Sequence, residues 1–368
     1  MVKFLDIKKI TDSFQPEIGR VVQRVLESGY FIRGVEVERF EAAYTSYTGT
    51  RHCVGTGNGF DALRLIFRGW LVLGVVKEGD EVIVPANTYI ASMLAVTENR
   101  LMPVLVEPDL DTFTVSHERI EEKITSRTRA IMVVHLYGRN AMSPEIKELA
   151  RNHNLKIVED NAQASGCFSG SVHTGALGDA GAHSFFPTKN LGALGDGGAV
   201  TTDDGDLAET IRTLGNYGSH KKGVNHLQGV NSRLDEVQAA VLGLKLGRLD
   251  ADNALRREVA RFYMKHITNP QIILPTESAV ADEQVWHLFV IRCLHRDALQ
   301  DYLRRAGIET LVHYPVPPHR QQAYREMNRL AFPITEKIHR EVLSLPLSAV
   351  ITEDELREVI TAVNTFRR

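Results

Sequence analysis

The chain has 368 residues, of which 43% are hydrophobic and 24% are charged, and its formal net charge is -3. This length is too great for one small core, so we expect a large domain and a smaller one. The composition is ordinary for a globular protein. The small negative charge gives no reason to expect binding to nucleic acid or attachment to an anionic membrane.

The cysteines and the apolar stretches indicate a cytoplasmic protein. Cys53, Cys167 and Cys293 are few, odd in number and far apart, which is typical of reduced thiols and not of a disulfide framework. No apolar stretch is long enough to span a bilayer. The first residues lack the uninterrupted apolar core of a secretion signal.

Helices and strands alternate over the first two thirds of the chain. In chain order we expect helices over 16–27 and 35–47, a strand over 52–54, a helix over 61–70, a strand over 81–84, a helix over 89–97, strands over 102–106 and 130–134, a helix over 144–152, and strands over 155–158 and 199–202. The helical segments show apolar residues at helical spacing, and the strands are mostly apolar. This alternation predicts an α/β fold with a mostly parallel sheet between helices.

The remainder of the chain has a different character. A long helix over 234–252 leads out of the large domain, followed by a strand over 285–293 and helices over 296–306 and 353–365. We therefore expect a large domain over 1–245 and a smaller α+β domain over 246–368. The N-terminal arm can join the smaller domain.

Lys189 and Asp160 are the strongest candidates for chemistry. Lys189 follows an apolar run and precedes a glycine-rich loop, so its amine loses hydration, and this lowers its pKa and makes it nucleophilic. Asp160 lies at the end of an apolar strand, where open α/β sheets bind ligands. A Schiff-base lysine and an acidic partner for a pyridinium nitrogen are what pyridoxal phosphate requires. The alternative is a surface lysine and an acidic loop residue, which is the better interpretation for either residue alone.

The glycine loop around Gly59 admits two interpretations. Its glycines lie between a predicted strand and a predicted helix, so their amides can hold a phosphate. Gly55, Gly57 and Gly59 are also close to a dinucleotide fingerprint. However, the spacing differs from G-x-G-x-x-G, and the next strand ends without an acidic residue for a ribose. The motif favours a phosphate site over NAD binding.

Over nearly its whole length the chain resembles the DegT/DnrJ/EryC1/StrS sugar aminotransferases, which are fold-type I pyridoxal phosphate-dependent transferases. The resemblance rests on eight motifs in this order: Ser28-Gly-Tyr-Phe-Ile-Arg-Gly34, Val84-Pro-Ala-Asn-Thr-Tyr89, Val134-His-Leu-Tyr-Gly138, Val158-Glu-Asp-Asn-Ala-Gln163, Ser184-Phe-Phe-Pro-Thr-Lys-Asn190, Gly195-Asp-Gly-Gly198, Gly229-Val-Asn-Ser-Arg-Leu-Asp-Glu236 and His313-Tyr-Pro315.

The resemblance implies roles for the cofactor-side residues. Lys189 would hold the cofactor aldehyde and later move a proton, and Asp160 would keep the pyridine nitrogen protonated. Gln163 would bind near the ring hydroxyl, and Tyr89 would stack on the ring. Ser184 and the amides of Gly59 and Phe60 would hold the phosphate, although Phe60 lacks the hydroxyl of the threonine found in many relatives. Asn231 would reach the phosphate from a second subunit, which implies a homodimer with shared active sites.

The substrate-side residues are inferred in the same way. The resemblance places Tyr30, Tyr217, His220, His313, Tyr314 and His319 near the sugar nucleotide, with Lys221 and Lys222 available to attract its diphosphate. An exposed basic loop is an equal alternative for Tyr217 and His220. For His135, Tyr137 and His287 we favour a place in the core. The histidines show no metal-ligand spacing, so we predict no metal.

The resemblance implies an aminotransferase that uses an amino acid, with L-glutamate preferred, and passes through pyridoxamine phosphate. The acceptor would be a nucleotide-linked keto-6-deoxyhexose, such as a dTDP sugar. The run from Gly57 to Leu63 looks like the subgroup that aminates C3, and the amino sugar would serve a polysaccharide or O-antigen, or a secreted metabolite. Alternatives are a C4-aminotransferase, a UDP-sugar 3-aminotransferase, and a regulatory or binding protein without turnover. A related dehydratase is disfavoured, because in the family's dehydratases another residue takes the place of the Schiff-base lysine, whereas this chain has Lys189.

Overall fold

The computed structural model describes residues 1–221 and 223–368. Lys222, predicted from the sequence to attract a substrate diphosphate, lies outside the described residues.

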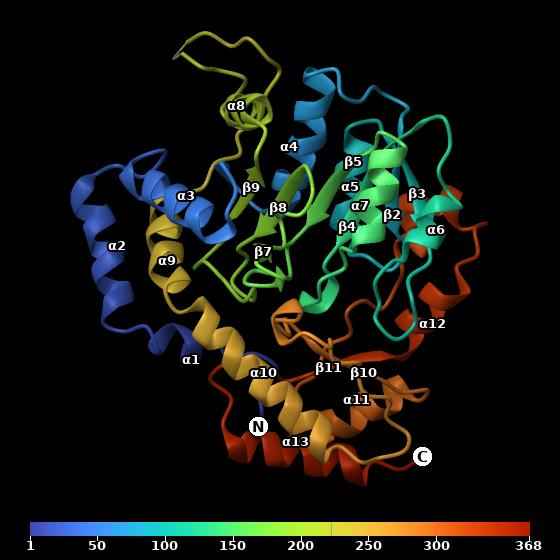
Figure 1. Ribbon diagram of the computed structural model, residues 1–368. Helices are drawn as coiled ribbons and strands as arrows, with labels where there is room; N and C mark the ends of the chain where they lie inside the picture. The colour runs from blue at the N-terminus through green and yellow to red at the C-terminus, as the bar shows by residue number, and fades with distance from the viewer. Residues whose placement is uncertain (222) are drawn as a thin grey trace.

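A seven-stranded sheet forms the centre of the larger part of the molecule (Figure 1). In spatial order its strands are β1 (His52–Thr56), β9 (Gly198–Thr202), β8 (Ala180–Ser184), β5 (Lys156–Asp160), β4 (Thr128–Val134), β2 (Glu81–Pro85) and β3 (Met102–Val106). Neighbouring strands from β8 to β3 are parallel, whereas β9 is antiparallel to both β8 and β1. The prediction of an α/β fold with a mostly parallel sheet is confirmed.

Helices cover both faces of this sheet (Figure 1). One face packs on α4 (Gly59–Val72), α5 (Ile90–Glu98) and α8 (Gly205–Leu214). The other face packs on α3 (Val35–Thr48), α6 (His117–Glu121), α7 (Pro144–Asn152) and α9 (Glu236–Leu246). In β4, Met132 belongs to the first of these two cores and Ile131 and Val133 to the second. The strand can therefore be apolar throughout, because its alternating side chains are buried on both faces.

A second hydrophobic core lies around a two-stranded sheet. The elements around it are α10 (Leu249–His266), β10 (Phe289–Arg292), α11 (Arg296–Arg305), β11 (Val342–Leu345) and α13 (Glu353–Thr365). Val2 at the start of the chain is buried in the same core and pairs with Ile308. The boundary between residues 245 and 246 stays a prediction.

The other elements are short or peripheral. They are α1 (Ile7–Asp12), α2 (Glu17–Ser28), α12 (Pro333–Glu341), the strands β6 (Phe168–Ser169) and β7 (Val172–His173), and the 3-10 turns η1 (Leu136–Gly138), η2 (Ala281–Glu283), η3 (Pro318–Arg320) and η4 (Gln322–Met327). Across residues 1–221 and 223–368, no helix has the length and hydropathy that crossing a bilayer requires.

The prediction of one helix over 234–252 is wrong. α9 ends at Leu246, Gly247 and Arg248 interrupt the helix, and α10 begins at Leu249 and continues to His266. Gly247 has low helix propensity. In addition, α9 buries residues against the large sheet, whereas α10 buries Val259, Ala260 and Tyr263 in the second core. One straight helix could not bury its apolar residues in both of these cores. The strand expected over 285–293 is likewise only β10.

Polar residues gather where the parallel strands end. β5 ends at Asp160 and β8 ends at Ser184, while the loops after β2 and β4 carry Tyr89 and His135. Because these strands are parallel, their carboxyl ends lie at one edge of the sheet, which is where open α/β sheets bind ligands.

Glu236 holds the start of α3 against α9. Its carboxylate accepts hydrogen bonds from the amides of Gly34 at 2.7 Å, Glu36 at 2.9 Å and Val37 at 3.0 Å, and the residue is buried. These are first-turn amides that have no acceptor within the helix.

We predict that Glu236→Ala lowers the free energy of unfolding by about 2–4 kcal/mol, because the amides then stay buried without an acceptor. Urea unfolding followed by circular dichroism measures the change. The control is Glu258→Ala on an exposed position of α10, which should change stability by less than about 0.5 kcal/mol. Equal effects of the two substitutions would contradict the capping role.

Candidate active site

A cavity of about 390 Å³ opens at the carboxyl edge of the sheet. It is lined by most of the residues predicted from the sequence, namely Gly59, Phe60, Tyr89, Asp160, Gln163, Ser184, Lys189, His313 and Tyr314. The first seven follow strands of the large sheet, and the last two come from the chain beyond α11. The fold therefore brings together residues that are up to 255 positions apart, from Gly59 to Tyr314.

The Lys189 amine is enclosed although part of its side chain remains accessible. Lys189 lies in the loop between β8 and β9, and its amide donates to the carbonyl of Phe186 at 2.8 Å. Burial lowers the pKa of Lys189 to about 8, and the nearby Asp160 carboxylate opposes this shift. A fraction of the amine is therefore uncharged near neutral pH, which is the nucleophilic form.

Asp160 presents a buried carboxylate to the cavity. Burial raises the pKa of Asp160 above its ordinary value, while a hydrogen bond from the Ser92 hydroxyl at 2.7 Å acts in the opposite direction. The amide of Ala162 donates to the other carboxylate oxygen at 3.2 Å. A protonated nitrogen placed beside this buried carboxylate would stabilise its ionised form.

Hydrogen bonds fix the orientation of Gln163. Its Oε1 accepts from the amide of Tyr137 at 2.6 Å, and its Nε2 donates to the hydroxyl of Tyr314 at 2.9 Å. The Tyr314 ring lies 4.9 Å from the ring of Tyr89, with 33° between their planes. Tyr89 is half exposed and is free to offer a ring face to a ligand.

The N-terminus of α4 forms a cradle beside Ser184. Asn58 caps the helix by accepting from the amide of Asp61 at 2.8 Å, so the amides of Gly59 and Phe60 belong to the first turn. A Cβ atom on Gly59 would lie 2.5 Å from the Cβ of Ser184. Only glycine allows this approach, and helix N-termini are favourable sites for phosphate.

These groups fit pyridoxal phosphate. The cofactor has an aldehyde, a basic ring nitrogen and a phosphate, and the cavity offers an amine, a carboxylate and a helix N-terminus beside a serine. Among the described residues, no group of three or more histidine, cysteine, aspartate or glutamate side chains is placed to hold a metal ion.

The other predicted residues lie outside this cavity. Tyr30 and Tyr217 are 73% and 52% exposed. His220 contacts Glu209 at 2.8 Å and the Thr213 hydroxyl. His319 is fully buried against Phe332 and binds Glu336 at 3.1 Å, so it does not face a ligand in this conformation.

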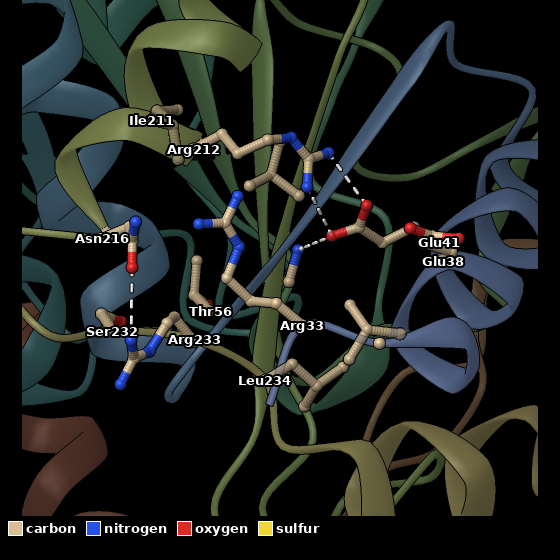
Figure 2. Close-up of a pocket in the computed structure, with 15 residues that line it drawn as sticks. Arg33, Glu38, Glu41, Thr56, Ile211, Arg212, Asn216, Ser232, Arg233 and Leu234 are labelled. Atoms are coloured by element: carbon tan, nitrogen blue, oxygen red, sulfur yellow. Dashed lines mark hydrogen bonds and ion pairs between the residues drawn. The ribbon is translucent and has the colours of Figure 1, made fainter. Parts of the chain in front are cut away.

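Asn231 lies beside a second cavity, of about 370 Å³. Asn231 pairs with Asn216, which lines this cavity together with Ser232. Figure 2 shows the side chains of Arg33, Arg212 and Arg233 around it, with Arg212 paired to Glu41 at 2.9 Å. Ser232 also accepts from the amide of Gly57 at 2.9 Å, so this cavity and the Gly59 loop are neighbours.

The sequence did not identify three residues of this site. Ser92 was not predicted, and His135 and His287 were assigned to the core only. Ser92 could have been noticed as a buried serine within an apolar helix. His135 and His287 are buried as expected, yet both also line the cavity. His135 accepts from the amide of Ala141 at 3.1 Å through Nδ1, so its Nε2 faces Glu159, which lies 2.8 Å away.

Comparisons with known proteins identify the family of this chain. The model of the DegT/DnrJ/EryC1/StrS aminotransferase family matches residues 12–364. A dTDP-3-amino-3,6-dideoxy-alpha-D-galactopyranose transaminase of Aneurinibacillus thermoaerophilus is 54% identical over 100% of this chain and 99% of that protein.

Two solved structures are similar as well. DesV of S. venezuelae is 45% identical with a TM-score of 0.94, covering 99% of this chain and 97% of the other. NtdA of Bacillus subtilis, solved with bound pyridoxamine phosphate, is 31% identical with a TM-score of 0.89, covering 98% and 83%. The chain therefore belongs to the DegT/DnrJ/EryC1/StrS aminotransferase family and is a pyridoxal phosphate-dependent aminotransferase.

Proposed function

We propose that this enzyme transfers the amino group of L-glutamate to C3 of a dTDP-linked 3-keto-6-deoxyhexose. The observation that carries the proposal is the placement of the Lys189 amine and the Asp160 carboxylate in one cavity with the Gly59 cradle. The similarity to the A. thermoaerophilus transaminase, whose name specifies a 3-amino dTDP sugar, supports the substrate. The product class suits the synthesis of a polysaccharide or O-antigen.

The residues of the cavity have distinct roles in this proposal. Lys189 holds the cofactor aldehyde, Asp160 keeps the ring nitrogen protonated, and Gln163 binds beside the ring hydroxyl. Ser184 and the Gly59 and Phe60 amides hold the phosphate, and Tyr89 covers one ring face. When bound, pyridoxal phosphate withdraws electrons from the substrate carbon that carries nitrogen, which makes the proton on that carbon removable.

Lys189 is then the proton carrier in both halves of the reaction. With the donor in place, the free Nζ of Lys189 would take the proton from Cα of glutamate and pass it to the bound cofactor. In the second half the same Nζ delivers a proton to C3 of the sugar. Because burial lowers the pKa of this amine to about 8, it can accept and release protons near neutral pH. The presence of Lys189 disfavours the dehydratase alternative.

We also propose that the enzyme is a cytoplasmic homodimer with shared active sites. Asn231, Tyr30 and Tyr217 lie outside the Lys189 cavity. Tyr30, Phe31 and Ile32 are exposed and directly precede Arg33, which lines the second cavity. Contiguous exposed apolar residues favour a protein partner. A second copy would cover them and bring its Asn231 to the phosphate.

A division of the chain at 245/246 completes the proposal. His287, His313 and Tyr314 come from the later part and line the cavity together with residues of the large sheet. The site then lies where the two domains meet, which is a common position for ligand pockets.

The first test follows the absorbance of the purified enzyme loaded with pyridoxal phosphate. We predict a band of the lysine-bound cofactor that disappears with glutamate and returns with a dTDP-3-keto-6-deoxyhexose. The control variant Lys189→Ala should lack the band. Recovery only with a 4-keto sugar would contradict the C3 assignment, and recovery only with a UDP sugar would contradict the dTDP assignment. Loss of the band with glutamate but no recovery with any ketosugar would favour a protein without this turnover.

A second prediction concerns Ser92, which donates to Asp160. We predict that Ser92→Ala weakens pyridoxal phosphate binding about 10-fold, because the ionised carboxylate loses its closest hydrogen bond. Absorbance titration of the cofactor-free protein gives the affinity. Thr97→Val is the control, since Thr97 lies on the same helix but contacts the Tyr324 hydroxyl. Equal affinities of wild type and Ser92→Ala would contradict the role of Ser92.

A third prediction tests the shared site by complementation. Lys189→Ala and Asn231→Asp should each be inactive as homodimers, because one lacks the amine and the other repels the phosphate. Co-expression creates mixed dimers in which one site has both native residues, so roughly a quarter of wild-type activity should return. The mixture would remain inactive if Asn231 acted within its own subunit, and an active Asn231→Asp homodimer would contradict any role of Asn231 at the phosphate.

A further inference from the structure

A small cavity adjoins the active site on the side of the second hydrophobic core. It has a volume of about 90 Å³ and shares Thr188, His287 and His313 with the Lys189 cavity. Its remaining wall is apolar except for one arginine, Arg256. This space is much smaller than the 390 Å³ cavity at Lys189, so it suits a small group such as a carboxylate better than a nucleotide sugar.

Arg256 is a buried cation without a carboxylate partner. It lies on α10, is 5% exposed, and has no acidic side chain within ion-pair distance among the described residues. Its Nη1 donates to the carbonyls of Trp286 at 3.3 Å, His287 at 3.4 Å and Leu347 at 3.5 Å. These bonds are at the long end of the normal range. They leave the other guanidinium nitrogens without a protein acceptor in the described structure.

Arg292, which is buried to a similar extent, differs from Arg256 because it has carboxylate partners. Arg292 is 6% exposed, and it contacts both Glu341 and Asp111 at 3.2 Å. Buried arginines are normally paired in this way, because an uncompensated charge is costly in a low dielectric. Burial lowers the pKa of Arg256 to about 10, which reflects the same cost.

The charged groups around Arg256 do not supply the missing anion. Asp252, one turn earlier on α10, attracts Arg256 but is paired with Arg248 at 3.1 Å. His287 lies near both Lys189 and Arg256, since burial and then these two cations lower its pKa. His313 is likewise held uncharged by burial and by Lys189, with a pKa of about 4. The two imidazoles that the cavities share are thus uncharged, and each cavity has one cation on its wall, Lys189 in one and Arg256 in the other.

We propose that Arg256 binds a carboxylate of the amino-acid donor in this small cavity. The inference rests on the proposed function, because only transamination requires an amino acid that reacts at Lys189. A donor whose amino group lies at Lys189 can extend a carboxylate past His287 toward the guanidinium. A guanidinium matches a carboxylate with two parallel hydrogen bonds. The apolar wall, which includes Phe4 and Leu5 of the N-terminal arm, strengthens this contact by excluding water.

The test separates the two half-reactions in the enzyme loaded with its cofactor. We expect Arg256→Met to weaken the apparent affinity for glutamate by about 10- to 100-fold, measured from the rate of loss of the cofactor band against glutamate concentration. The reaction of the pyridoxamine phosphate form with the ketosugar should be unchanged. Arg256→Lys should recover part of the glutamate affinity, because lysine keeps the positive charge but lacks the two parallel N–H donors of the guanidinium.

The matched control is Arg257→Met. Arg257 is the next residue on α10, and its guanidinium faces Asp282 at 3.6 Å and does not line the cavity. This variant should behave as wild type in both half-reactions. Alanine as donor identifies the carboxylate: a defect shared by alanine and glutamate assigns the α-carboxylate, and a defect with glutamate alone assigns the side-chain carboxylate.

Two results would overturn the inference. One is unchanged glutamate affinity in Arg256→Met. The other is an equal loss in both half-reactions and in cofactor affinity for Arg256→Met and Arg256→Lys, which would show that Arg256 only supports the carbonyls of residues 286, 287 and 347. Failure of the wild-type enzyme to respond to glutamate would instead contradict the proposed function, so the two failures are distinguishable.

Discussion

The structure of the active site depends on the burial of two opposite charges that are not in direct contact. The Asp160 carboxylate and the Lys189 amine both line one cavity, and each influences the pKa of the other. Burial disfavours the charged form of both groups. A ligand with a basic nitrogen for Asp160 and a carbonyl for Lys189 relieves both penalties, which is why the site is suited to pyridoxal phosphate.

The alternation of β5 explains how one carboxylate remains available. Successive strand residues point to opposite faces. Glu159 therefore points away from Asp160, and its oxygens accept from the amides of Gly175 at 2.8 Å and Leu177 and Gly178 at 2.7 Å. Burial alone would raise the pKa of Glu159, but His135 and these amides hold it below its ordinary value. The oxygens of Glu159 are thus occupied by hydrogen bonds within the protein, whereas the carboxylate of Asp160 can still bind a ligand.

Contacts between the large sheet region and the later part of the chain support the cavity. Glu107, after β3, accepts from the amides of Ile334 at 2.9 Å and Thr335 at 2.8 Å and so caps α12. Gln163 connects Tyr137, in the turn η1 after β4, with Tyr314 of the later segment. The proposed donor subsite at Arg256 uses the same junction, because α10 passes from one core to the other.

The sequence determined the elements that depend on local pattern. Apolar runs that alternate with amphipathic segments are enough to predict a parallel sheet, and the ends of its strands place Asp160 and Ser184 at one edge. Lys189 and the Gly59 loop were recognisable because their chemistry requires particular residues at short spacing. The helix over 234–252 was mispredicted because local propensity does not reveal that its two halves serve different cores.

Only the tertiary structure decided which distant residues share the site. His135 and His287 carry no local signal that separates a ligand contact from core packing, since a residue in either role is buried. His319 illustrates the reverse case, because its motif resembles a substrate segment while its ring is enclosed by Phe332 and Glu336. The spacing of residues in the sequence shows which reactive groups occur together in one loop or strand. The direction and burial of a side chain depend instead on packing between elements that are far apart in the chain.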